Sequence, residues 1–413
     1  MAQSLFSTLA DDVLARCDLL ACYSEEPNRI TRTCLCGAMH QVHASLRTWM
    51  ERAGMSVRLD AAGNLIGHYP AAGAGARALL IGSHLDSVPD AGKYDGILGV
   101  LLGVAAVQAL GGQRLPFAIE VLGFCEEEGI RFRTPFLGSL AVCGRLTEEF
   151  LERTDDNGVS LSEALRHFGI DPARVSEAAY WPGGVLGYLE AHIEQGPVLD
   201  DAKLPLGVVD AIVGTSRCWL RFVGKAGHAG TLPMALRQDA LVAAAEFIIA
   251  VDRAARSVDG LRATVGSLTV APDAVNVVPG LARLSLDVRH PLDEVREQAV
   301  ASLREQAAAV AARRGVALHV DQPDSRGAVP TDPRLTRLLA ETVARAGYPV
   351  HRMASGAGHD AAVMATLTPA TMLFIRSPGG ISHHPAEAVL PQDVTAALEV
   401  MVAFLHRLAG DAR

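Results

Sequence analysis

The sequence predicts an α/β fold with a mixed, largely parallel sheet, interrupted by a smaller inserted α+β domain. The apolar run ALLIGSH at 78–84 has no polar alternation, which is typical of a strand buried on both faces of a sheet. A helical segment at 97–110 and an apolar strand at 117–124 follow, in the strand–helix–strand order of α/β proteins. Near residue 211 this pattern changes, and near residue 328 it returns.

The change of pattern predicts two domains, of which the larger is discontinuous in the sequence. Residues 1–210 and 328–413 should form one domain, because a helix at 333–346 and a strand at 370–377 resume the α/β order. Residues 211–327 should form the inserted domain, a compact unit of the ferredoxin-like α+β type. A chain of 413 residues is long enough to bury two cores.

The first part of the larger domain contains helical and strand-like patterns in turn. Residues 4–54 are mainly helical in pattern, and Gly54 is placed to end the last helix as a C-cap. The segment SVRLDAAGNLIGHY at 56–69 has strand character. The longest apolar segment, at 96–112, contains Gln108 and several glycines, so we expect a buried helix rather than a membrane span.

The inserted domain has five expected elements. The order strand, helix, strand, strand, helix is predicted from alternating apolar residues in the strands and from long alanine-rich periodic segments in the helices. These elements are expected at 216–227, 233–256, 262–270, 276–290 and 294–315.

The amino-acid composition indicates which kinds of molecule the protein binds. With 37 Lys and Arg against 46 Asp and Glu, the formal net charge of −9 offers no footprint for nucleic acid or an anionic membrane, so we expect a small-molecule substrate. The N-terminal residues lack the pattern of a signal peptide. Seven cysteines, an odd number, indicate a reducing cytoplasm rather than a disulfide framework, and we expect Cys34 and Cys36 to be free thiols.

Residues that can carry chemistry follow the predicted strands. His84 and Asp86 stand two apart at the end of one strand, so both can project on the same side, where Asp86 can orient the imidazole of His84. On local evidence, a surface histidine beside a turn aspartate is the alternative. Asp95, in GKYDGILG, has a local alternative as the cap of the following helix.

Further His, Asp and Glu residues follow other strands of the same domain. Because sites in open α/β sheets lie at the carboxyl ends of strands, we expect these side chains to meet. Their nitrogen and oxygen atoms suit two divalent ions of Zn, Mn, Co or Ni. The group comprises His84, Asp95, Glu126, Glu127, Glu128, His192, Glu194, His383 and His384, and Gln195 directly follows Glu194.

Eight segments in chain order resemble the M20-type metallohydrolases: GSHLDSV, YDGILG, EEEGIRF, EAHIEQGPVLD, GKAGHAGTLPM, NVVPGLARLSLDVRH, SGAGHDA and GISHHPAE. The resemblance spans roughly residues 80–390. It is most similar to the hydantoinase/carbamoylase branch, which includes N-carbamoyl-L-amino-acid hydrolase, β-ureidopropionase and allantoate amidohydrolase. Ordinary M20 peptidases share the first metal motif but not usually EAHIEQG or the NVVPG and DVRH pair.

The resemblance implies a dinuclear metallohydrolase and assigns its ligands by motif. His84 and His383 correspond to terminal ligands of opposite metal ions, and Asp95 corresponds to the carboxylate that bridges them. Glu128 corresponds to the acidic ligand and His192 to the remaining histidine ligand. We expect two divalent ions per subunit.

The resemblance also implies catalytic roles. Glu127 corresponds to the general base that takes a proton from water, and Asp86 to the residue that orients His84. His228 corresponds to a histidine that stabilises the oxyanion and that in relatives reaches the site across a dimer interface. We therefore expect a homodimer through the inserted domain, which would also act as a lid. Without the flanking motif, His228 would be a structural histidine at a strand-to-loop junction.

Four positions correspond to the substrate side of the family site. Asn276 and Arg289 match residues that hold the substrate's carboxylate, for which the planar guanidinium is suited. Gln195 and Gly358 match further substrate-side positions. An exposed strand arginine paired to a surface acid is the alternative for Arg289.

Three positions depart from the commonest family pattern, namely Leu232, Gln238 and His384, which leave the expected ligands in place but alter the pocket or its hydrogen bonds. The leading hypothesis is an amidohydrolase that cleaves the carbamoyl C–N bond of N-carbamoyl-L-amino acids or N-carbamoyl-β-amino acids. An allantoate amidohydrolase is the second hypothesis. A catalytically silent homologue that binds a ureide or amino acid is the third.

Overall fold

The computed structural model describes residues 2–411, and the side chains of residues 5–410. The chain divides into two compact units. Unit 1 comprises Met1–Asp210 and Thr331–Arg413, and unit 2 comprises Ala211–Pro330.

The chain leaves unit 1 along β6 (Leu206–Ile212) and returns after β15 (Val329–Pro330). The sequence pattern placed the second boundary between residues 327 and 328. In the structure unit 2 ends at Pro330, three residues later.

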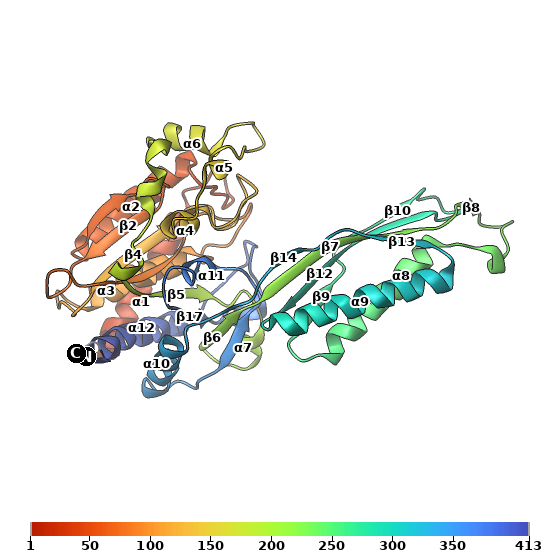
Figure 1. Ribbon diagram of the computed structural model, residues 1–413. Helices are drawn as coiled ribbons and strands as arrows, with labels where there is room; N and C mark the ends of the chain where they lie inside the picture. Colours follow the sequence, from red (N-terminus) through yellow and green to blue (C-terminus); the bar gives the residue numbers. More distant parts are fainter. Residues whose placement is uncertain (1, 412–413) are drawn as a thin grey trace. The chain divides into compact units, whose positions relative to one another are not determined.

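The larger sheet has nine strands and a parallel centre (Figure 1). Besides β6 and β15 its strands are β1 (Ser56–Leu59), β2 (Leu65–Tyr69), β3 (Ala78–His84), β4 (Ala118–Phe124), β5 (Val185–Ile193), β16 (Arg352–Ser355) and β17 (Ala370–Ile375). The order is β1-β2-β4-β3-β5-β17-β6-β15, and β16 also pairs with β6. The neighbours β4, β3, β5 and β17 run parallel, while β2 and β6 flank them antiparallel. The predicted α/β class is confirmed, and the carboxyl ends of four parallel strands share one edge.

Helices cover this sheet. They are α1 (Ala2–Ala21), α2 (Gly37–Arg52), α3 (Ile97–Ala109), α4 (Leu137–Val142), α5 (Glu148–Leu151), α6 (Leu161–His167), α7 (Val198–Asp201), α10 (Pro333–Arg345), α11 (Asp360–Met364) and α12 (Pro391–Asp411). The glycine-rich apolar segment forms α3, which is buried from Ile97 to Val107, as predicted. A Cβ at Gly99 would collide with the carbonyl oxygen of Ala191, so glycine allows α3 to pack directly on β5. Within residues 2–411, we find no helix with the length and apolar character needed to cross a membrane.

The N-terminal region is less helical than its sequence pattern predicts. Residues 22–36 form an irregular segment between α1 and α2, although a mainly helical region was expected across 4–54. The guanidinium of Arg32, which is 3% exposed, anchors this segment by donating to the carbonyl oxygens of Leu85, Leu20 and Tyr23. The C-cap of α2 is Ala53 rather than Gly54, which was expected there; Gly54 follows it with a φ of 88° and donates to the carbonyl of Glu51.

One cysteine prediction is wrong. Cys34 is joined by a disulfide to Cys125, which stands 91 positions later in the sequence, with Cα atoms 5.4 Å apart, whereas Cys36 is a free thiol as expected. A pairing over this distance cannot be deduced from cysteine spacing. The expected cytoplasmic location stays a prediction.

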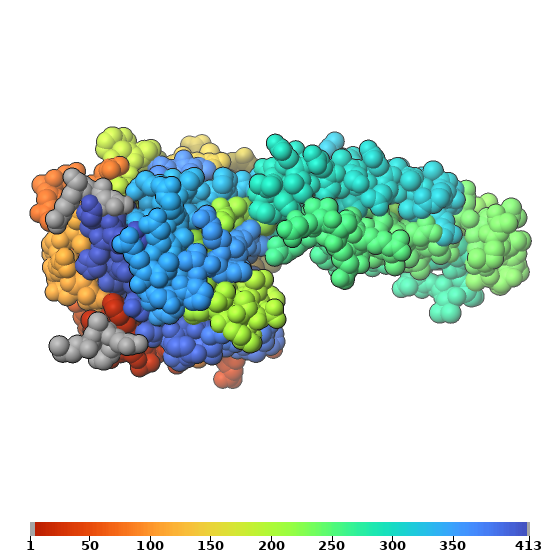
Figure 2. Space-filling view, turned by 90° about the horizontal axis from the view of Figure 1, so that it is seen from below, coloured from red at the N-terminus to blue at the C-terminus, as the bar shows by residue number. Residues whose placement is uncertain are grey.

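Unit 2 has a second sheet with two helices on one face. Its elements are β7 (Gly214–Val223), β8 (Gly227–His228), α8 (Ala240–Ser257), β9 (Arg262–Thr264), β10 (Leu268–Ala271), β11 (Val277–Val278), β12 (Leu281–His290), α9 (Asp293–Arg314), β13 (Ala317–Val320) and β14 (Asp324–Arg326). The order β10-β12-β7-β13 is antiparallel and has the ferredoxin-like arrangement that was predicted. The helix expected from residue 233 begins later, because the Asp239 side chain caps α8. Figure 2 shows α8 in green and α9 in teal on the surface of this unit.

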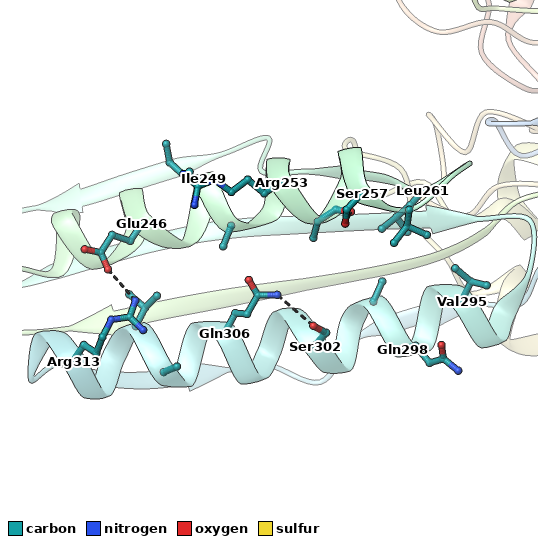
Figure 3. Close-up of a pocket in the computed structure, with 16 residues that line it drawn as sticks. Glu246, Ile249, Arg253, Ser257, Leu261, Val295, Gln298, Ser302, Gln306 and Arg313 are labelled. Atoms are coloured by element: carbon teal, nitrogen blue, oxygen red, sulfur yellow. Dashed lines mark hydrogen bonds and ion pairs between the residues drawn. The ribbon is translucent and has the colours of Figure 1, made fainter.

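A groove of about 940 Å³ runs between α8 and α9 (Figure 3). Glu246 of α8 pairs with Arg313 of α9 across it, at 3.3 Å between Oε2 and Nη2. None of the candidate residues from the sequence is among the described residues that line this groove, so we do not assign the substrate to it.

Candidate active site and metal centre

The shared edge of the parallel strands gathers the candidate residues of unit 1. His84 is the last residue of β3, and His192 is the residue before the last in β5. The acidic triplet Glu126–Glu128 begins two residues after β4 ends, and His383 follows β17 through a short 3-10 turn. Strand topology therefore brings together residues that are up to three hundred positions apart in the chain.

Asp95 lies at the centre of this group. Its Oδ1 atom is 3.1 Å from His192 Nε2 and 3.5 Å from His84 Nε2, while its Oδ2 atom is 3.1 Å from His383 Nε2. His383 Nε2 is also 3.5 Å from Glu128 Oε1. Two groups able to hold an ion result, one of His84, Asp95 and His192, the other of Asp95, Glu128 and His383. They share the Asp95 carboxylate, as a bridging ligand would.

Backbone carbonyls orient the two buried histidines. His84 Nδ1 is 2.9 Å from the carbonyl oxygen of Asp86, and His192 Nδ1 is 2.9 Å from that of Ile193, which leaves both Nε2 atoms directed at Asp95. The predicted partner of His84 was the carboxylate of Asp86, whose Oδ1 is 3.8 Å away. This carboxylate also accepts hydrogen bonds from the backbone N–H groups of Glu127 and Glu128, each at 3.1 Å, and its role in orienting His84 stays a prediction.

The three acids have different surroundings. Glu126 has a φ of 58° and its Oε1 accepts a hydrogen bond of 2.7 Å from the backbone N–H of Phe132, so it holds the turn after β4. Glu127 and Glu128 form a further possible ligand group with His84. The sequence left the role of Glu126 open, and the structure gives it a structural hydrogen bond.

Burial raises the pKa of all three acids. It raises the pKa of Glu126 to about 8 and that of Glu128 to about 7, with Asp86 and Asp95 among the carboxylates that add to the shifts. Burial and the nearby Asp360 carboxylate raise the pKa of Glu127 well above its ordinary value, although His84 opposes this. A carboxyl group with a raised pKa can accept and return a proton near neutral pH.

The donor set fits divalent cations. Asp95 Oδ1 is buried and accepts no hydrogen bond, which suits an oxygen that coordinates a metal ion. Burial favours the neutral form of Asp95, but the imidazoles of His192, His383 and His84 outweigh it and hold the pKa of this carboxyl well below its usual range. Imidazole and carboxylate ligands suit Zn, Mn, Co and Ni alike.

Gln195 contacts these ligand groups directly, whereas Gly358 lies against Phe136, whose N–H donates to the carbonyl of Glu127 at 3.3 Å. Gln195 Nε2 donates to Asp95 Oδ2 at 2.9 Å and is 3.2 Å from His383 Nε2. The Cζ of Phe136 would be 3.0 Å from a Cβ at Gly358. His383, rather than His384, faces the ligand group, since His384 Nδ1 accepts a hydrogen bond from the nearby N–H of Ala386.

Three buried residues at the site were missed. His359 packs its ring on His192 at 4.5 Å between centroids, and burial together with His192 lowers its pKa well below the ordinary value. Glu190 accepts hydrogen bonds from Ser83 Oγ and the N–H of Ala361. Asp360 Oδ1 is 2.6 Å from Ser139 Oγ. The signals were available, because EAHIEQG places Glu190 two residues before His192 and SGAGHDA contains His359 and Asp360.

Unit 2 brings His228 and Asn276 together but separates them from Arg289. His228 lies in β8, opposite Val277 of β11, and the N–H of Ala229 donates to the carbonyl of Asn276 at 2.9 Å. These residues lie beyond the end of β12 that begins at Leu281, whereas Arg289 is eight residues further along that strand, or about 26 Å at 3.3 Å per residue. Asn276 and Arg289 of one copy therefore cannot hold the same carboxylate, and their expected roles at the substrate stay predictions.

Arg289 forms an ion pair on its own strand. Its Nε is 2.8 Å from Asp287 Oδ1 and its Nη2 is 3.0 Å from Asp287 Oδ2, and Arg217 Nε contacts the same carboxylate at 2.7 Å. The hydrogen bond to Asp287 raises the pKa of Arg289, which keeps the guanidinium charged. Arg289 is therefore paired with an acid on its own strand, as the alternative interpretation expected. The same pairing with Asp287 fixes the direction of the guanidinium.

The sequence and fold match a known family. The family described as Peptidase family M20/M25/M40 matches residues 80–407. The chain belongs to this family. Within it, the chain belongs to the hydantoinase/carbamoylase branch, whose members include the relatives below, so it is a hydrolase of C–N bonds in a metal-dependent family.

Curated relatives and solved structures of this M20 branch cover nearly the whole chain. The chain is 38% identical over 439 residues to a probable allantoate deiminase of Oryza sativa subsp. japonica, covering 98% of this chain and 89% of the relative. It is 39% identical over 384 residues to an N-carbamoyl-L-amino acid amidohydrolase of Geobacillus stearothermophilus, covering 92% and 93%. A crystal structure of a hydantoinase/carbamoylase family amidase from Burkholderia ambifaria has a TM-score of 0.91 at 33% identity, covering 97% and 98%.

Metal affinity should fall as pH is lowered. A histidine must be neutral to bind a cation. Burial lowers the pKa of His84 and His192, but neighbouring carboxylates outweigh it and raise both above the ordinary value; the Asp95 carboxylate likewise raises the pKa of His383. These rings are therefore protonated up to a higher pH than free histidine, and each ion must displace protons. Competition with a coloured chelator for Zn²⁺ or Mn²⁺ between about pH 6 and 8 measures this; an affinity independent of pH would contradict it.

Proposed function

We propose that the protein hydrolyses the carbamoyl C–N bond of an N-carbamoyl-L-amino acid or N-carbamoyl-β-amino acid, releasing the amino acid, CO₂ and ammonia. The observation that carries the proposal is the pair of ligand groups that share Asp95, with Glu127 beside them. Similarity to relatives named N-carbamoyl-L-amino acid amidohydrolase supports the choice of bond.

The residues of unit 1 can divide the chemical work. His84, Asp95 and His192 would hold one divalent ion, and Asp95, Glu128 and His383 the other. When bound, such ions lower the pKa of water and polarise a carbonyl oxygen. Glu127 accepts the proton of the attacking water as its oxygen adds to the carbamoyl carbon. Glu127 then returns this proton to the leaving nitrogen as the C–N bond breaks.

We propose that Arg289 binds the carboxylate of the substrate. Asp287 holds its guanidinium in one orientation and leaves it charged, and a planar guanidinium matches the two oxygens of a carboxylate. Gln195 and Gly358 would contact the substrate from beside the metal ligands, where their contacts with Asp95 and Phe136 lie.

We further propose a homodimer in which unit 2 of one copy completes the site of the other. The separation of His228 and Asn276 from Arg289 along β12 supports this proposal, because one small substrate cannot contact both ends of unit 2 of a single copy. Arg289 and His228 at one site would then come from different copies, and His228 would stabilise the oxyanion.

Allantoate, a ureide that also carries a carboxylate, is the second candidate substrate. Relatives named allantoate deiminase are as similar to this chain as the carbamoylases are, at 37–38% identity. The chemistry at Glu127 would be the same, so the choice depends on the substrate pocket. The third hypothesis is a catalytically silent homologue that binds such compounds without hydrolysing them. The presence of a general base, Glu127, argues against it.

Metal-reconstituted protein should hydrolyse N-carbamoyl-L-amino acids or N-carbamoyl-β-alanine faster than allantoate, measured as ammonia release with all substrates in parallel. Glu127→Gln should lower kcat by about 10²- to 10⁴-fold, because the amide cannot accept the proton. Its metal content, measured by elemental analysis, should match the wild type. Preference for allantoate would move the assignment to the second candidate. Full activity in Glu127→Gln would refute the mechanism.

Arg289→Lys should lower kcat/KM by roughly 10- to 100-fold for substrates with a free carboxylate, because lysine loses the bidentate hydrogen bonds. It should have a much smaller effect on the corresponding methyl esters. Arg283→Lys is the matched control, since Arg283 lies on the same strand and stacks on Trp219 at 4.0 Å. Equal losses in the two variants would rule out a specific role for Arg289.

Mixing two inactive variants tests the contribution of the second copy. Glu127→Gln and His228→Ala homodimers should each have low activity. A mixed dimer should recover about half of the wild-type activity, because one of its two sites then contains both wild-type residues. Activity is measured after the subunits are exchanged and the mixed dimers are isolated with two affinity tags. If both residues act within one copy, each site keeps one defect and no activity returns.

A further inference from the structure

Glu387 is a buried carboxylate at the edge of the candidate metal centre to which the family roles above assign nothing. It follows His383 and His384 in the loop that leads to α12, and it is 4% exposed. Burial and the neighbouring Asp95 carboxylate raise its pKa. A second acid beside Asp95 is unfavourable, so its hydrogen bonds must explain its place.

One oxygen of Glu387 holds the backbone of the Asp95 loop. Its Oε1 atom accepts hydrogen bonds from two consecutive N–H groups, that of Tyr94 at 2.9 Å and that of Asp95 at 3.1 Å. A Cβ at Gly92 would collide with the Glu387 side chain, so this loop lies directly on the carboxylate. The position of the Asp95 backbone therefore depends on a residue 292 positions away in the sequence.

The other oxygen of Glu387 holds the loop that carries His383. Its Oε2 atom is 3.1 Å from the hydroxyl of Ser382, which is also 3.2 Å from Asp95 Oδ2. The same side chain thus joins the two loops that supply Asp95 and His383. By contrast, His84 and His192 are oriented by backbone carbonyls of their own segments.

We propose that Glu387 is a positioning residue that fixes the separation of Asp95 and His383 and thereby sets the affinity of the ion held by Asp95, Glu128 and His383. The inference rests on the proposed dinuclear centre. Loss of Glu387 should lower the affinity for this ion more than the affinity for the ion held by His84, Asp95 and His192, because those two histidines keep their own hydrogen bonds.

Titration of metal-free protein with Co²⁺ tests the proposal, with binding followed by visible absorption and bound metal counted after gel filtration. The wild type should bind two ions. Glu387→Ala should bind one ion with nearly wild-type affinity and the other about 10- to 100-fold more weakly, the usual cost of losing a partner that orients a metal ligand. Glu387→Gln should bind both ions within about threefold of the wild type, because its amide oxygen can still accept both N–H groups.

Asp239→Ala is the matched control. Asp239 Oδ1 also accepts from two consecutive backbone N–H groups, those of Leu241 and Val242, but it lies in unit 2 at the start of α8. The Asp239→Ala substitution should lower the melting temperature of the protein without changing its Co²⁺ affinity. If Glu387→Ala fails to fold, Ser382→Ala can replace it, because it removes only the contacts that the Ser382 hydroxyl makes with Glu387 and Asp95. It should still lower the affinity for one of the two ions selectively.

The outcomes separate the two hypotheses. Two ions bound with wild-type affinity by Glu387→Ala and Ser382→Ala would overturn the positioning role while leaving the metal centre intact. Equal losses in Glu387→Ala and Glu387→Gln would also overturn it. Wild-type protein that binds fewer than two ions would refute the proposed centre, and the role of Glu387 with it.

Discussion

The arrangement of this structure depends on one constraint, the burial of many carboxylates at a single edge of a sheet. Four parallel strands end there, and the loops that follow them supply acids that repel one another. Peptide N–H groups offset part of this cost. The carboxylates of Asp86, Glu126 and Glu387 each accept backbone hydrogen bonds from the loops that carry the candidate ligands. These hydrogen bonds lower the cost of burying the carboxylates and also hold the loops in place. The ligand loops are therefore ordered by the same contacts that stabilise the buried charge.

The two ligand groups around Asp95 are unequal in their surroundings. The side chains of His84 and His192 are 2% and 1% exposed, and both are oriented by rigid strand ends. The side chain of His383 is 46% exposed, lies in a loop and contacts Gln195. One group is therefore part of the protein core, while the other depends on contacts between loops. A substrate that enters from solvent would meet the second group first, on the side where the candidate substrate residue Gln195 also lies.

Much of the fold followed from local patterns. Unbroken apolar runs identified β3, β4 and β17, and their ends located the acids and histidines that the topology then brought together. Local patterns could not show which groups each side chain contacts in the folded protein. Period-two alternation places Asp86 on the side of His84, but it cannot show that peptide N–H groups occupy its carboxylate. The family resemblance assigned Asn276 and Arg289 to one carboxylate, yet most of the thirteen positions from one to the other are extended strand, so the two residues of one copy lie far apart. The irregular segment 22–36 depends on the buried Arg32, whose partners are distant in sequence.

The disulfide between Cys34 and Cys125 links the folding of unit 1 to thiol chemistry. It spans 91 residues and is attached one residue before the acidic triplet. A cross-link of this span restricts the unfolded chain and contributes on the order of 4–5 kcal/mol in the chain-entropy view. Where thiol reductants open the bond, that contribution is lost, while the hydrogen bond from Arg131 to the carbonyl of Cys34 still joins the same two segments. The redox state of the protein's surroundings would then change its resistance to unfolding.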